Sequence, residues 1–223
     1  MIPPAFPGDG LPPGARRSPV EPALVRALGL RPLPREGGWF VETWRSREVV
    51  PTPFGERSRS TAILYLVAEG FPSTLHRLRF DEVWHWHLGD PVEWIAVPGD
   101  GAARRVVLGP DLEEGMQVQA VVPAGAWQGA RLLPGGAWAL LGTTMAPGFD
   151  PADFEGATAA EAAALAAAHP AHADLLRALA PPVRSTGTAG GLRPPRRGHP
   201  PAERDPRPAG NAPCRGRRRR PAP

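Results

Sequence analysis

Histidine and glutamate side chains that could do acid–base chemistry lie close together in the segment GFPSTLHRLRFDEVWHWHLGDP, residues 70–91. Residues 73–79 are typical of a β-strand, and side chains along a strand alternate between its two faces. His76 then lies on the strand face opposite to that of Arg77 and Arg79. Since two arginines on one face indicate solvent, we expect His76 to point inward.

A second candidate group lies on the strand expected at 82–88. Glu82 shares a face of this strand with Trp84 and Trp86. If that face is the interior one, His76 and Glu82 meet in one cavity, where a histidine oriented by a carboxylate acts as a general base.

The same strand carries two more histidines, His85 and His87, on the face opposite Glu82. We expect them to look outward, onto another layer or a partner subunit, which makes them poor metal ligands. A β-bulge would reverse this expectation, because one inserted residue exchanges the two faces.

The only tyrosine of the chain, Tyr65, is a candidate acid. Its phenol is a proton donor that could complement a histidine base. Tyr65 shares a strand face with Ile63 and Val67, so a structural role as a core aromatic residue is the alternative.

Other side chains are candidates for binding a ligand rather than for moving a proton. Trp94, together with the two tryptophans of 82–88, would form a stacking wall for a sugar or a base, or would fill the core. Arg59 precedes a strand and suits a carboxylate or phosphate, or is a solvated loop residue. Glu42 lies between two aromatic residues, which favours a pocket lining or a subunit contact.

The elements that position these residues are predicted to be strands. Between Gly37 and Thr144, short runs rich in Val, Ile, Trp and Thr alternate with Gly, Pro and Asp. We expect strands at 38–46, 60–68, 73–79, 82–88, 92–98, 103–108, 116–122, 127–133 and 137–144. Short strands at this spacing, with no helix between them, predict an antiparallel barrel or sandwich. Such a barrel encloses a core and one ligand-sized cavity.

Short helices are expected at both ends of this all-β core. At the first end, Ser18 and Glu21 have capping-box spacing, and Gly29 supplies a stop. At the other, Thr158 and Glu161 repeat the capping-box spacing before an alanine-rich run.

The organisation predicted from composition is a loose Pro/Gly-rich segment at 1–17, one domain at 18–180 and a disordered tail at 181–223. The formal net charge of +4 arises in the tail, where eleven arginines face two acids, while the rest of the chain is mildly acidic. Nucleic acid is therefore expected as a partner only through this tail, for example through Arg217–Arg220.

The single cysteine, Cys214, excludes an intramolecular disulfide framework. No apolar run approaches the roughly 20 residues of a membrane span, and no signal peptide is recognisable at the start. We expect a cytoplasmic protein that does not bind membranes.

The spacing of Gly70, His76, Leu78, Glu82 and Gly89 resembles the first cupin motif, with leucine in place of its second histidine. A later segment, PAGAWQ, resembles the second motif, with glutamine where the family usually has its third metal histidine.

The resemblance extends over about residues 20–180, to the small single-domain cupins sometimes called cupin type five. The segments that carry it are GGWFVETWRS, STAILYLV, LHRLRFDEVWHWHLGDPVEW, VPAGAWQGARL and APGFDPADFEGA. It implies a double-stranded β-helix, the cupin jelly roll, and a homodimer.

The two departures from the cupin motifs bear on metal binding. Cupin metal sites generally use three histidines and a glutamate, and this chain matches them only at His76 and Glu82. Leu78 has no donor atom, and the neutral amide of Gln128 is a weak one. We expect no cofactor; a divalent metal at His76, Glu82 and Gln128, with Glu42 swinging in, is the alternative.

Three functions stay open at this point. The first is a metal-independent epimerase or isomerase of a sugar or sugar nucleotide, with His76 as base, since the similar dTDP-sugar epimerases are cupins that use a histidine–carboxylate pair and a tyrosine. The second is a non-catalytic protein that binds a small polar molecule. The third, a metal-dependent cupin enzyme, ranks below both because of Leu78 and Gln128.

Overall fold

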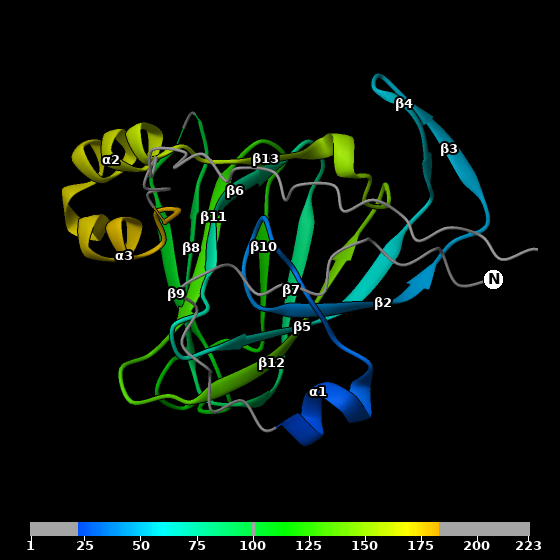
Figure 1. The fold of residues 1–223 in the computed structure, drawn as a ribbon. Coiled ribbons are helices and arrows are strands. Elements are labelled where there is room, and N and C mark those ends of the chain that lie inside the picture. Colours follow the sequence, from blue (N-terminus) through cyan, green and yellow to red (C-terminus); the bar gives the residue numbers. More distant parts are fainter. Residues whose placement is uncertain (1–21, 100, 183–223) are drawn as a thin grey trace, which may run out of the picture. The chain divides into compact units, whose positions relative to one another are not determined.

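Two β-sheets pack face to face in the computed structural model, which describes residues 22–99 and 101–182 (Figure 1). The first has the strand order β1 (Arg31–Pro32), β2 (Trp39–Arg45), β5 (Thr61–Ala68), β12 (Trp138–Met145), β7 (Glu82–Gly89) and β10 (Gln119–Val122). The second has the order β13 (Phe154–Gly156), β6 (Ser73–Leu78), β11 (Trp127–Leu132), β8 (Val92–Val97) and β9 (Arg104–Leu108). Neighbouring strands are antiparallel. The predicted all-β jelly roll is confirmed.

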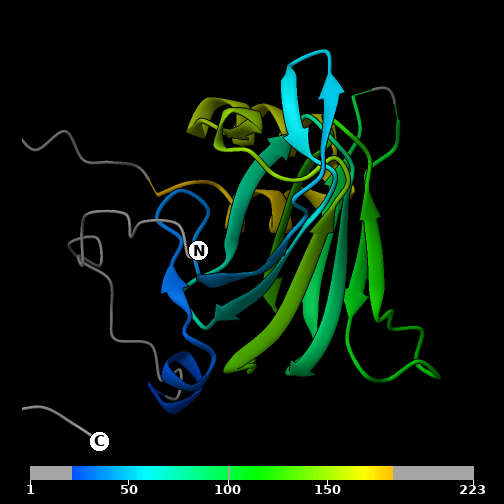
Figure 2. The same ribbon diagram turned by 90° about the vertical axis from the view of Figure 1, so that its right-hand side faces the viewer.

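Each of the nine predicted strands corresponds to a strand of these sheets. The sequence reading missed the hairpin of β3 (Val49–Thr52) and β4 (Gly55–Ser58), which forms a sheet of its own. Figure 2 shows this hairpin extending beyond the ends of the two large sheets. The sequence did not predict the short edge strands β1 and β13 either, because their two and three residues are too few for an alternation pattern.

The main core lies between the two sheets, and strand alternation decides which side chains reach it. On β8, Val92, Trp94 and Ala96 join this inner core. The intervening Ile95 and Val97 pack on the other side, against the C-terminal helices. A strand buried on both faces reads as a nearly continuous apolar run, and in VEWIAV only Glu93, which pairs with Arg105 and Arg131, interrupts it.

Helices cover the outer faces of both sheets (Figure 1). α2 (Ala159–Ala168) and α3 (Ala173–Ala178) pack on the second sheet through Leu75 and its neighbours. The predicted capping box is present, since Thr158 Oγ1 accepts from the Glu161 amide and Glu161 Oε2 accepts from the Thr158 amide. α1 (Pro22–Leu28) covers Leu66 and Leu140 of the first sheet. The 3-10 turns Pro151–Asp153 and Pro170–His172 complete these connections.

The register shifts within three of the described strand pairs, and one of these shifts lies between Gln128 and Ala130 of β11. The register between β7 and β12 shifts after Trp86, so the predicted alternation from Glu82 to Trp86 holds. The register between β2 and β5 shifts between Glu42 and Trp44. After this shift, Trp44 is 53% exposed, whereas Glu42 is partly buried.

Several sequence predictions concern residues outside those described. They are the loose segment 1–17, the cap formed by Ser18 and Glu21, and nearly all of the predicted disordered tail at 181–223. In the described ranges, no helix is long and apolar enough to cross a membrane.

Candidate functional site

His76 points into the space between the sheets, as predicted, and is 1% exposed. Its Nδ1 lies 2.8 Å from the main-chain oxygen of Thr74, so Nδ1–H donates to that carbonyl. The second ring nitrogen, Nε2, is then the basic one. Phe154, on β13, stacks on the imidazole with 5.2 Å between ring centroids and closes this side of the barrel.

Glu36 is the residue that sequence reasoning missed. Its Oε1 lies 3.9 Å from His76 Nε2 and accepts a hydrogen bond of 2.7 Å from Ser73 Oγ. The loop before β2 carries Glu36 inward, because its main-chain oxygen accepts from the Thr74 amide of β6. The following Gly37 has a φ of +105°, and a Cβ there would meet the Pro72 oxygen at 2.2 Å. The acid followed by two glycines was the available signal, since such a pair permits this turn.

Glu82 and Trp84, from the first sheet, form a buried hydrogen-bonded cluster with Gln128, from the second sheet. Gln128 Nε2 donates to Glu82 Oε2 at 2.8 Å, and Trp84 Nε1 donates to Gln128 Oε1 at 2.7 Å. Burial raises the pKa of Glu82, and the charge of Glu36 raises it further. His76 and the bonded side chains act in the opposite direction but do not cancel these effects. Glu82 is therefore held in its acid form to a higher pH than a free glutamate.

His76 and Gln128 are directly paired across β6 and β11. Glu82, from the other sheet, is close enough for its charge to interact with His76. The structure thus brings together His76, Glu82 and Gln128, with Glu36 beside the imidazole.

Tyr65 is fully buried in the inner core, and its ring meets Trp84 edge to face at 5.8 Å. Its hydroxyl donates to the Gly37 oxygen at 2.9 Å. Burial raises the pKa of the Tyr65 phenol well above its ordinary value, and the charge of Glu36 adds to this. The hydroxyl therefore supports the Glu36 loop and lies next to Glu36 rather than being free to give up its proton.

The three predicted stacking tryptophans are not equivalent. Trp84 and Trp94 are fully buried, whereas Trp86 is partly buried and donates from Nε1 to the Asp90 oxygen at 3.3 Å. Trp94 Nε1 is buried without a hydrogen-bond partner in the described part of the chain. Trp84 and Trp94 therefore fill the space between the sheets, which is the core-filling alternative.

Two candidates lie apart from this cluster. Arg59 is at the surface, where Nη1 pairs with Glu48 Oε2 at 2.8 Å, so it does not line the interior. Glu42 is partly buried on β2 and is held by Arg45 at 2.6 Å. The ligand-binding role expected for Arg59 is not supported, because its strand begins after it and leaves it outside the barrel.

His85 and His87 lie on the outer face of the first sheet, as predicted, with their rings stacked at 6.3 Å. Gln119 Nε2 donates to His85 Nδ1 at 2.9 Å, and His85 Nε2–H donates to Thr144 Oγ1 at 3.0 Å. Partial burial lowers the pKa of His85, and the neighbouring His87 acts in the same direction.

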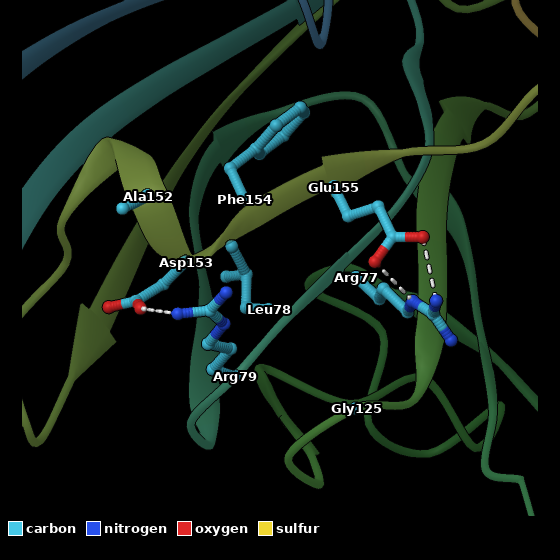
Figure 3. Close-up of a pocket in the computed structure, with 8 residues that line it drawn as sticks. All are labelled: Arg77, Leu78, Arg79, Gly125, Ala152, Asp153, Phe154 and Glu155. Carbon is cyan, nitrogen blue, oxygen red and sulfur yellow. Dashed lines mark hydrogen bonds and ion pairs between the residues drawn. The ribbon is translucent and has the colours of Figure 1, made fainter. Parts of the chain in front are cut away.

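His76, Glu82 and Gln128 are all buried, so their side chains are closed off from solvent. A surface cavity of about 360 Å³ lies elsewhere, along β6 and β13 (Figure 3). Its lining includes Arg77 and Arg79, which point away from the interior. The interior cluster is therefore a closed site.

The interior side chains do not fit a metal set of three histidines and a glutamate. His76 is the one imidazole among them, and both ends of the Gln128 amide are engaged by Trp84 and Glu82. Among residues 22–99 and 101–182, no three or more His, Cys, Asp or Glu side chains are grouped so as to hold a metal ion. We therefore derive no chemistry through a metal.

Known proteins similar to this chain share its fold over most of the described residues. A hypothetical protein from Leishmania major is 33% identical, with a TM-score of 0.63, over 70% of this chain and 96% of that one. Protein SO0799 from Shewanella oneidensis is 30% identical, with a TM-score of 0.61, over 71% and 96%.

A curated relative, the uncharacterised protein YML079W of Saccharomyces cerevisiae, is 29% identical over 130 residues. This alignment covers 52% of the present chain and 65% of the yeast protein. The family model described as "Cupin superfamily (DUF985)" matches residues 22–157. On this match and on its fold, the chain belongs to the cupin superfamily, in the family DUF985.

Proposed function

We propose that the barrel interior carries out metal-independent acid–base chemistry, as an isomerase of a small sugar-like molecule, with His76 as the general base. The observation that carries the proposal is the orientation of His76. Its Nδ1–H is committed to the Thr74 carbonyl, and its basic Nε2 faces the Glu36 carboxylate at 3.9 Å. A carboxylate in this place stabilises the imidazolium that forms when Nε2 takes a proton.

Glu82 supplies the complementary acid. Its raised pKa favours the protonated form, which can donate to a carbonyl oxygen. His76 removes the proton from the carbon beside the carbonyl, and the electron pair moves to the oxygen, which takes the Glu82 proton. His76 then returns its proton to the former carbonyl carbon while Glu82 takes one from the neighbouring hydroxyl. Every atom and proton is balanced, and the carbonyl has moved by one carbon.

The position of Tyr65 favours an isomerase over an epimerase. An epimerase needs a second acid that returns the proton to the other face of the same carbon. The Tyr65 hydroxyl donates to Gly37, and the phenol has a raised pKa, so both features support a structural role. Substrate access to His76 requires the Phe154 ring or the Glu36 loop to move.

The test is hydrogen exchange from carbon in D2O, followed by proton NMR. The probes are glucose, mannose, fructose, ribose and their phosphates. We expect the intact protein to wash out the C2 proton of one probe, and His76→Ala to slow this by about 10²–10⁴-fold. The matched control is His87→Ala, which removes an exposed histidine of the outer face and leaves the exchange unchanged.

Equal exchange in the intact protein and a folded His76→Ala variant would refute the base assignment. If His76→Ala does not fold, as judged by circular dichroism, His76→Gln replaces it. Binding of a probe without any exchange supports the second candidate, a non-catalytic binding protein. That candidate is favoured by the mutually satisfied Glu82, Gln128 and Trp84, and by the unpaired Trp94 donor, to which a bound ligand would offer an acceptor.

A further inference from the structure

We propose that the surface cavity along β6 and β13 binds a phosphate group of a small molecule, with Arg79 as its principal donor. The cavity measures about 360 Å³, within the range of small-molecule pockets. It lies between two arginine–carboxylate pairs, Arg77 with Glu155 and Arg79 with Asp153 (Figure 3). The cavity shares Phe154 with the surroundings of His76, but Arg77 lies on the face of β6 opposite His76.

The charge of Asp153 is already balanced by a different arginine. Arg57 Nε and Nη2 donate to the two Asp153 carboxylate oxygens at 2.6 and 2.8 Å, in a bidentate pair. Both side chains are buried, and the remaining Arg57 Nη1 donates to the Glu56 oxygen at 2.9 Å. Since this pair is complete, Asp153 has little need of a second cation.

Arg79 is that second cation. Its Nη1 approaches Asp153 Oδ1 only to 3.5 Å, beyond a strong hydrogen bond, and its side chain is 46% exposed. The guanidinium lies over the Phe54 ring at 4.5 Å, and Phe54 packs edge to face on Phe80. The aromatic contact holds the guanidinium in place while leaving donors of its planar fork for a ligand.

The opposite wall of the cavity is electrically balanced. Arg77 donates to the two Glu155 oxygens at 2.6 and 3.0 Å and lies over Trp127 at 4.7 Å. Arg57 and Arg77 each form a bidentate pair with a carboxylate, Asp153 and Glu155, whereas Arg79 has only a longer contact to the already paired Asp153. The charges of Asp150 and Glu161 also reach Arg57 and Arg77. A planar arginine fork matches two oxygens of a phosphate, so the half-exposed and incompletely paired Arg79 guanidinium favours an anion of this kind.

The experiment is a titration of the full chain with inorganic phosphate at low ionic strength, followed by amide and arginine side-chain NMR shifts. We expect saturable shifts at Gly125, Glu155 and the Arg79 side chain. Arg79→Gln should weaken this binding by about tenfold or more, as expected for a lost charge-assisted hydrogen bond. The matched control is Arg59→Gln, an exposed arginine paired with Glu48, which leaves the shifts unchanged.

Site-resolved shifts separate the cavity from the arginine-rich C-terminal segment, which is the same in all three proteins. Shifts of equal size in the intact protein and in Arg79→Gln would overturn the proposal. The proposal would also be overturned if Arg79→Gln and Arg59→Gln weakened phosphate binding equally. Shifts with chloride that equal those with phosphate, at matched ionic strength, would overturn it too. None of these outcomes bears on the role of His76, so the two proposals fail or stand separately.

Discussion

Histidines on neighbouring segments of this protein lie in opposite environments. His76 is buried between the sheets, beside Glu36 and near Glu82. His85 and His87 lie on the outer face of the first sheet, where the partners of His85 are the neutral side chains of Gln119 and Thr144. The histidine-rich motif is therefore less informative than the single histidine before it. Burial together with carboxylates, and not the number of imidazoles, gives a side chain the setting for acid–base chemistry.

The largest expected effect is the difference in stability between truncating a tryptophan of the packed interior and truncating an exposed one. Trp84→Ala should lower the free energy of unfolding by about 3–5 kcal/mol, because it empties a large volume between the sheets. It also leaves Gln128 Oε1 without its donor. The control is Trp44→Ala, at the exposed tryptophan of β2, which should change stability by less than about 1 kcal/mol. Urea unfolding measures both, and similar losses in the two variants would contradict a closed, packed interior.

The pH dependence of the free energy of unfolding should reveal the raised pKa of Glu82. Its pKa is raised in the folded state, so the folded protein binds more protons than the unfolded chain above the ordinary pKa of 4.5. The contribution of Glu82 to stability is therefore present at low pH and lost as pH rises through the folded pKa. Glu82→Gln, which is always neutral, should flatten this fall.

The measurement for Glu82 is the free energy of unfolding in urea from pH 4 to pH 8, in the intact protein and in the variant. Glu48→Gln, at an exposed carboxylate, is the matched control and should leave the profile nearly unchanged. A Glu82→Gln profile parallel to that of the intact protein would show that burial does not perturb this carboxyl group.

The smallest effect is expected from the outer histidines. The pKa of His85 is lowered below its ordinary 6.5, so the folded state binds fewer protons than the unfolded chain near that pH. Its contribution to stability is present above pH 6.5 and lost as pH falls toward the folded pKa. Removing the charge of a neighbour with His87→Gln should weaken this loss. Thermal unfolding between pH 7.5 and 5 measures this fall in stability. A steeper fall in His87→Gln than in the intact protein would contradict the prediction.

The fold could be predicted from the sequence because its main signals are local. Alternating apolar residues and the turns between them located nine strands, and alternation alone placed His76 inside and His85 outside. The capping box of Thr158 and Glu161 is likewise a local signal, because it spans only four residues. The hairpin β3–β4 was missed because VVPTPFGERS contains two prolines and charged residues, which lower its resemblance to a strand.

The site was harder to predict, because its decisive contacts join distant segments. Glu36 reaches His76 only because its loop bonds to Thr74 across the barrel edge. The sequence left open whether the tryptophans form a stacking wall or fill the core, since volume and packing decide this, and Trp84 and Trp94 fill the core. Arg79 was read only as a sign of solvent, and the donors that it keeps available depend on the pairing of Arg57 with Asp153.

The strip of chain that carries Phe154 has a single neighbour in its sheet. β13 joins β6 through only three residue pairs, and its other side has no strand. Lifting β13 breaks one short ladder and the Arg77–Glu155 pair, whereas displacing β6, β11 or β8 breaks two ladders. Local fraying at this border, which leaves the rest of the jelly roll folded, is therefore the least disruptive path by which a molecule in solution could reach the imidazole.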